Sequence, residues 1–201
     1  MRSNSGGSVR LLTGLLLATI CAVGMADGHG EKLAAALDAQ TDKTKARYEY
    51  RHPAETLTFF GIVPGMTVVE VLPGGGWYTR ILLPYLGPDG HLIGADYNVD
   101  IYRLLGFWSE EELEAKKTWA ETWPRRAENW RGENGAPVSA FVLGSMPEVF
   151  KGSADAVLLI RLLHNPARVR GKSDYDYTTE ILTGVYDVLK PGGIVGVVQH
   201  H

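Results

Sequence analysis

Short and largely apolar runs recur along the chain, and each is followed by a turn of glycine, proline or polar residues. Because these runs lack polar alternation, they are typical of strands buried on both faces of a parallel sheet. Helix-like segments separate them, and the alternation predicts an α/β fold. The expected strands are 67–72, 91–96, 138–143, 154–160 and 194–198, and the expected helices are 77–86, 110–120 and 178–189.

The first 26 residues have a different pattern. Arg2 and Arg10 precede a run of 16 mostly apolar residues, which falls short of the roughly 20 that span a bilayer. Small residues at Gly24 and Ala26 suit cleavage before Asp27, so residues 1–26 are predicted to be a secretory signal peptide. We therefore expect a periplasmic or secreted bacterial protein without stable membrane insertion after cleavage; an uncleaved anchor is the alternative.

The mature chain divides into two parts in this interpretation. Residues 27–53 alternate charged and apolar positions and predict a leader helix on the surface, and residues 54–201 form the folded domain. The connection 98–137 contains four of the five tryptophans. Those rings would form either an aromatic lid over an acceptor or part of the core packing.

Composition narrows the possible partners. With 45% hydrophobic and 21% charged residues, the chain is neither a coiled coil nor disordered. Its net charge of -3 becomes -5 without residues 1–26, since 18 basic residues then face 23 acidic ones. Nucleic acid is therefore not an expected partner, and a small-molecule substrate is favoured.

Two features predict a ligand that contains adenosine. Gly74, Gly75 and Gly76 form a turn between a strand and a helix, where a ligand can approach the backbone N–H groups. Asp96 ends the second strand, and a carboxylate there can accept hydrogen bonds from both hydroxyls of a ribose. The alternatives are a tight turn and a helix-capping aspartate.

Glu70 in the first strand, the glycine turn, Asp96 and the segment 189–193 follow one another in an order that resembles the class I S-adenosylmethionine-dependent methyltransferases. The blocks 51–56, 64–70 and 73–79 are most similar to a group of exported, predicted methyltransferases. The resemblance covers about residues 54–199 and implies a Rossmann-like parallel sheet with flanking helices. The class has seven strands, so we expect a chain truncated after the fifth strand, with an exposed edge and marginal stability.

The resemblance also implies a cofactor, S-adenosylmethionine, and the residues that hold it. Glu70 would hold the methionine amino group, the turn of Pro73, Gly74, Gly75 and Gly76 would pass its aliphatic part, and Asp96 would take the ribose. The class often has an acidic or amide side chain near the adenine, and Ser145 or backbone groups stand in that place here.

The candidates for chemistry follow the fourth strand, at the sheet edge where such folds bind ligands. Arg161, His164 and Asn165 are the catalytic candidates, with His164 as a general base or a substrate hydrogen-bonding group. His164 could instead pack at the strand end. Three secondary candidates are His52, Glu55 and His200, and His52 could simply be a turn residue before Pro53. No spacing of Cys or His indicates a metal site.

Three functions remain open from the sequence. The first is an exported methyltransferase that acts on a small molecule or an envelope component. The second is a non-catalytic protein that binds an adenosine-like or amino-acid-like ligand on the same fold. The third is an NAD-dependent oxidoreductase, although Thr79 stands where the third glycine of the dinucleotide fingerprint would fall.

Overall fold

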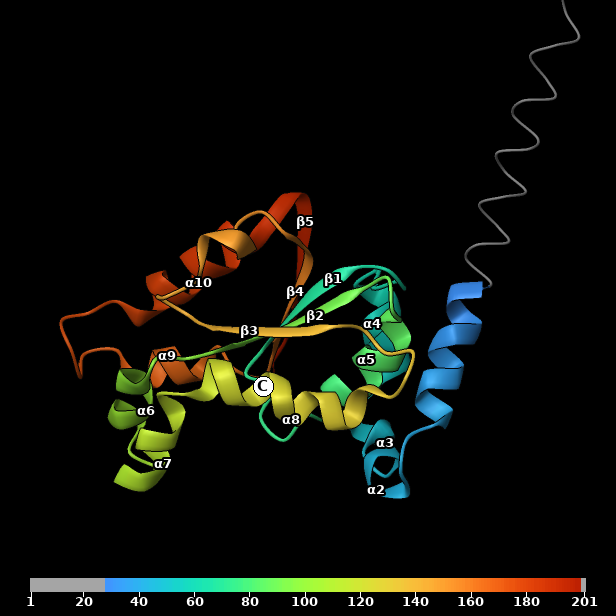
Figure 1. Ribbon diagram of the computed structural model, residues 1–201. Helices are drawn as coiled ribbons and strands as arrows, with labels where there is room; N and C mark the ends of the chain where they lie inside the picture. The colour runs from blue at the N-terminus through green and yellow to red at the C-terminus, as the bar shows by residue number, and fades with distance from the viewer. Residues whose placement is uncertain (1–27, 200–201) are drawn as a thin grey trace, which may run out of the picture.

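A computed structural model describes residues 28–199 and contains one five-stranded sheet (Figure 1). All strand pairs are parallel, and the spatial order is β3-β2-β1-β4-β5. This is the predicted Rossmann-like α/β sheet. The order reverses between β1 and β4, and ligands in such sheets bind where the carboxyl ends diverge. The strands are β1 (Thr67–Val71), β2 (His91–Asp96), β3 (Val138–Val142), β4 (Ala154–Ile160) and β5 (Leu189–Val198).

Helices cover both faces of the sheet, because successive strand residues point to opposite sides. Val68, Leu92 and Leu158 pack against the first helical layer, and their neighbours Val69 and Val157 pack against the second. The first layer contains a helix over residues 28–38, α4 (Pro53–Phe59), α5 (Thr79–Leu86) and α8 (Trp119–Arg131); the second contains α6 (Val99–Leu105), α7 (Glu110–Lys116), α9 (His164–Val169) and α10 (Tyr177–Val188).

The N-terminal segment differs from the single leader helix that the sequence predicts. After the helix over 28–38 come α2 (Asp42–Lys45) and α3 (Tyr48–Arg51), and the hydroxyl of Thr41 caps the start of α2. His52 has a φ of 42°, which ends α3, and Pro53 then starts α4. The turn alternative for His52 is therefore correct, and this break places α3 near the glycine turn.

Two further expectations can be compared with the structure. The fifth strand, expected at 194–198, begins earlier, because β5 starts at Leu189 and has a register shift between the pairs Leu189–Ala154 and Ile194–Ala156. Of the tryptophans in the connection 98–137, Trp119 and Trp123 are buried and stacked on each other, which supports the packing alternative. A short 3-10 turn, η1 (Glu148–Phe150), precedes β4. None of the helices within residues 28–199 has the length and apolarity needed to cross a membrane.

The sheet ends at β5 within the described part of the chain. Ile194, Val195 and Val197 of this strand are exposed to between 39% and 45%. An exposed strand edge with apolar side chains is open to pairing with another strand, as the sequence predicts for this position.

Candidate functional site

A cavity of about 450 Å³ lies at the point where the strand order reverses, beside the ends of β1 and β4. It brings together six of the predicted site residues, namely Glu70, Pro73, Gly74, Gly75, Arg161 and His164. It also contains residues that the sequence does not single out, among them Arg47, Arg51 and Tyr78. The cavity therefore joins the glycine turn to the predicted catalytic edge of the sheet.

The backbone is strained on two sides of this cavity. Leu72 follows β1 with a φ of 54°, and Arg161 follows β4 with a φ of 58°. Both are left-handed conformations that non-glycine residues rarely adopt. Neighbouring strands hold them, since Leu72 N donates to Ala95 O at 2.8 Å and Arg161 N donates to Val198 O at 2.7 Å. Strained residues that are held in this way are concentrated at functional sites.

Glu70 is the buried acid of the cavity, with 4% of its surface exposed. Thr79 at the start of α5 donates its hydroxyl to Glu70 Oε2 at 2.6 Å. Burial raises the pKa of Glu70 from 4.5 to about 7, although the bonds from Thr79 and the charge of Arg51 oppose this rise. The Glu70 carboxyl therefore titrates near neutral pH, and an ammonium group beside it would favour its ionised form.

We expect the stability of the protein to depend on Glu70 and on pH. The folded state holds the Glu70 proton more tightly than the unfolded state, so the free energy of unfolding falls as pH rises from 4.5 to about 7. The pKa difference corresponds to a fall of about 3 kcal/mol. Denaturant unfolding of the wild type and of Glu70→Gln at pH 5 and pH 7.5 measures it. Glu70→Gln should lose this fall in the free energy of unfolding, whereas Glu111→Gln, at an exposed residue, should keep it. Equal pH dependence in all three proteins would contradict the assignment of the effect to Glu70.

Arg51 is the residue that sequence reasoning missed most clearly. Its guanidinium carbon lies 4.6 Å from the centroid of the Trp77 ring, and its Nε is buried without a hydrogen-bond partner among the described residues. Burial and the charge of Arg47 lower the pKa of Arg51. The only signal in the sequence is that Arg47 and Arg51 are four residues apart, which places both on one side of a helical turn.

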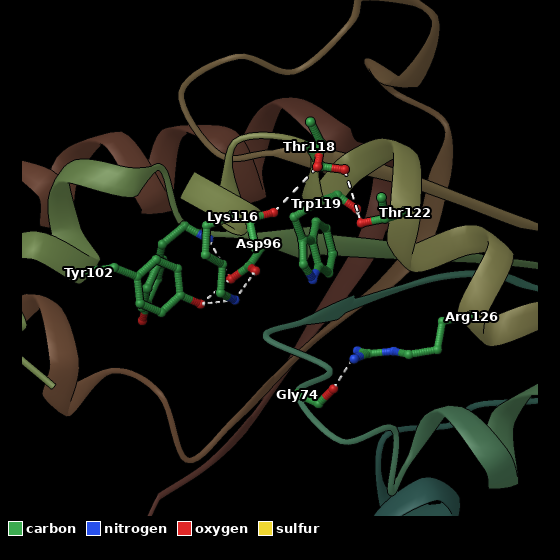
Figure 2. A network of polar contacts seen from close by, with 10 residues as sticks. Gly74, Asp96, Tyr102, Lys116, Thr118, Trp119, Thr122 and Arg126 are labelled. Carbon is green, nitrogen blue, oxygen red and sulfur yellow. Dashed lines mark hydrogen bonds and ion pairs between the residues drawn. The ribbon is translucent and has the colours of Figure 1, made fainter. Parts of the chain in front are cut away.

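Helix α8 holds the glycine turn from outside the cavity. Figure 2 shows Arg126 reaching the turn, where its Nη2 donates to Gly74 O at 2.8 Å. Trp130 lies so close to Gly76 that an added Cβ would come within 2.2 Å of its ring. Gly76 is therefore packed under Trp130, whereas Gly74 and Gly75 line the cavity.

Asp96 is buried, with 2% of its surface exposed, and it is already bonded (Figure 2). Lys116 Nζ lies 2.6 Å from Asp96 Oδ2, the Tyr102 hydroxyl donates to Oδ1, and the Tyr97 N–H donates to Oδ1 at 2.9 Å. Lys116 also lies 4.2 Å from the centroid of the Tyr102 ring. A ribose can bind Asp96 only if it replaces these partners, which the sequence did not indicate because Lys116 lies in a charged segment 20 residues away.

The other predicted residues lie in varied places. Gln199 Nε2 lies 3.1 Å from His164 Nδ1, and Asn165 makes a side-chain hydrogen bond with Tyr97 rather than lining the cavity. Ser145 is exposed outside the cavity lining, as are His52 and Glu55, whose side chains lie 3.6 Å apart. His200 and the predicted signal peptide fall outside the described residues. No group of three His, Cys, Asp or Glu side chains within 28–199 has a metal-binding arrangement.

Comparison with known proteins gives similarity at the level of solved structures. No family model matches the chain, and no curated protein matches it. A SAM-dependent methyltransferase from Aquifex aeolicus is 18% identical, with 79% of this chain and 68% of that chain covered and a TM-score of 0.44. An arsenic(III) S-adenosylmethionine methyltransferase from Chlamydomonas reinhardtii is 16% identical, with 81% and 47% covered and a TM-score of 0.40. At these identities the similarity concerns the fold alone, and this chain spans about half the length of the second protein.

Proposed function

We propose that this protein is an S-adenosylmethionine-dependent methyltransferase, with its donor and acceptor meeting in the cavity between β1 and β4. The observation that carries the proposal is Glu70, a buried carboxyl that lines the same cavity as the glycine turn and the strained Leu72, at the point where the strand order reverses. An ionised carboxylate at this place offers the partner that the donor's amino group needs. The backbone at Gly74 and Gly75 leaves room for the aliphatic part of the donor.

The residues that line the cavity fit the methionine half of the donor. The ribose fits only if Asp96 first loses its contacts with Lys116 and Tyr102. Glu70 and the turn are accessible from the cavity, but Asp96 has Lys116 and Tyr102 as partners and does not line it. When bound, S-adenosylmethionine supplies an electrophilic methyl group on a sulfonium sulfur. The chain's own contribution is to bind and align the two reactants, which can account for much of the rate in such a transfer.

His164 is best suited to hydrogen-bond the acceptor. Its Nδ1 faces Gln199 Nε2 at 3.1 Å. An amide nitrogen is a donor, so Nδ1 is the acceptor in this contact and a neutral imidazole then carries its proton on Nε2. In that tautomer Nδ1 is engaged and Nε2 is a donor, so of the two roles predicted from sequence this contact favours hydrogen bonding over proton removal.

Calorimetric titration of the full chain tests the proposal. We expect S-adenosylmethionine and S-adenosylhomocysteine to bind at one site and NAD not to bind. Glu70→Gln should weaken binding by about tenfold, since it removes a charge-assisted hydrogen bond worth roughly 1.5 kcal/mol, while Glu111→Gln, at an exposed residue of α7, should not change it. Binding should also be tighter at pH 8 than at pH 6, because Glu70 must lose its proton first. NAD binding alone would favour the oxidoreductase.

A non-catalytic ligand-binding protein is the second candidate. The contact between Lys116 and Asp96 favours it, because that ion pair occupies the carboxylate expected to hold the ribose. The two functions differ in turnover. Formation of S-adenosylhomocysteine with any member of an acceptor panel would exclude the binder, and donor binding without turnover across the panel would favour it.

We also propose that residues 1–26 direct export, so that the protein acts in the periplasm or outside the cell. The support is the charged start, the short apolar run and the small residues before Asp27. Fusion of these residues to a reporter that is active only after export tests this. An active reporter with an N-terminus at Asp27 is expected, and a reporter retained uncleaved in the cytoplasm would contradict the proposal.

A further inference from the structure

Basic groups outnumber acidic ones around the cavity. Arg47 and Arg51 line it, and Glu70 is the only acidic residue among the described residues that do so. Because burial raises the pKa of Glu70 to about 7, its carboxyl offsets at most one of the charges of Arg47 and Arg51 at neutral pH. The cavity therefore has a positive field suited to an anion.

Arg51 has the features of a ligand-binding guanidinium. Trp77 supports one side of the group at 4.6 Å, and the buried Nε lacks a hydrogen-bond partner among residues 28–199. This Nε is enclosed by the protein, so a ligand in the cavity contacts other atoms of the Arg51 side chain. The planar guanidinium fork matches carboxylate and phosphate oxygens, which can accept two parallel hydrogen bonds from it.

The donor alone does not account for this charge. Its methionine part carries one carboxylate, but its amino group and its sulfonium are both cationic. Binding it therefore adds positive charge to a cavity that Arg47 and Arg51 already line. A second anionic group in the same cavity would offset the repulsion, so donor and anion should strengthen each other's binding.

We infer that the methyl acceptor is a small molecule with a carboxylate or phosphate group, which Arg51 binds together with Arg47. His164 lines the same cavity. The acceptor role rests on the proposed methyltransferase function, whereas the anion site rests on the arginines alone.

The test is a calorimetric titration of the full chain with inorganic phosphate and with succinate, alone and with S-adenosylhomocysteine at saturation. We expect an anion to bind in both conditions, and the tighter of the two probes identifies the anionic group. Arg51→Gln should weaken binding at least tenfold and Arg47→Gln, on the exposed side of the cavity, several-fold. Arg103→Gln is the control, because Arg103 lies on α6 in an exposed ion pair with Glu110; it should leave anion affinity unchanged.

Each outcome separates the two proposals. Anion binding that competes with S-adenosylhomocysteine would overturn the inference, since the arginines would then serve the donor carboxylate. Absence of anion binding, or equal losses in Arg51→Gln and Arg103→Gln, would also overturn it. Arginine-dependent anion binding without any donor binding would support the anion site and contradict the methyltransferase. If Arg51→Gln does not fold, Arg51→Lys keeps the charge but removes the planar fork, and a several-fold loss in that variant supports the assignment.

Discussion

Replacing Gly76 by alanine is expected to lower the free energy of unfolding by about 2 to 5 kcal/mol. Two costs add at this residue. Its φ of 75° is left-handed, which costs an L-residue about 1–2 kcal/mol, and the new Cβ would meet the Trp130 ring at 2.2 Å, where overpacking costs about 1–3 kcal/mol. Trp130 has little freedom to withdraw, because the Arg80 guanidinium lies 4.1 Å from its centroid. Thermal unfolding should show a midpoint lower by roughly 5 to 15 °C.

Gly75→Ala is the matched control for this change. Gly75 lies next to Gly76 in the same turn, but its φ is not positive and an added Cβ would meet no atom within 4 Å. Its stability should therefore remain within about 0.5 kcal/mol of the wild type. Equal melting points for the two variants would mean that α8 does not hold the turn in the way the structure shows.

Replacing Lys116 by methionine is expected to destabilise the protein by about 3 to 5 kcal/mol at pH 7.5, the usual cost of leaving a buried carboxylate without its ion-pair partner. Burial raises the pKa of Asp96 even with Lys116 beside it, and removal of that charge raises this pKa further. Protonation of Asp96 relieves the cost, so the destabilisation should be smaller at pH 5 than at pH 7.5. Denaturant unfolding at the two pH values measures both effects.

Lys117→Met provides the control at the next residue. Lys117 forms an exposed ion pair with Glu114, and such pairs contribute about 0–1 kcal/mol. A loss in Lys116→Met no larger than in Lys117→Met would contradict the buried pair. Lys116→Met also tests the ribose assignment. Without Lys116, Asp96 can accept hydrogen bonds from a ligand, so the folded Lys116→Met protein should bind S-adenosylhomocysteine more tightly than the wild type.

The sheet could be predicted from sequence because its strands are short apolar runs bounded by glycine and proline. The bounds of Ala154–Ile160 match the expected fourth strand, and those of His91–Asp96 match the second. The N-terminal helices could not be predicted in this way, because residues 27–53 have weak apolar periodicity. The caps at Thr41 and His52 decide where these helices end and begin. Residues 190–193 end the preceding helix as expected, but β5 begins before them, at Leu189. They lie in a register shift between the pairs Leu189–Ala154 and Ile194–Ala156, and a run of apolar residues does not reveal such an irregularity.

The candidate site could be predicted only in part. Arg161 and His164 were found because strand ends in a parallel sheet meet at one edge. The glycine turn was found from its place between a strand and a helix, and Glu70 was implied by the family resemblance. The partners of Asp96 and the position of Arg51 depend on how separate helices pack, and local sequence carries no signal for such contacts. The structure thus adds two features to the predicted binding edge of the sheet. Asp96 is buried with its own hydrogen-bond partners, and Arg51 lines the cavity.

A crystal structure with S-adenosylhomocysteine tests the central claim most directly. The account predicts that the ligand's amino group lies within hydrogen-bond distance of Glu70, with the backbone of Gly74 and Gly75 against its aliphatic part. It further predicts that the ribose reaches Asp96 only where Lys116 has moved away from the carboxylate. A ligand bound elsewhere, or one in this cavity without contact to Glu70, would contradict the claim that this protein is built to bind a methyl donor at the junction of β1 and β4.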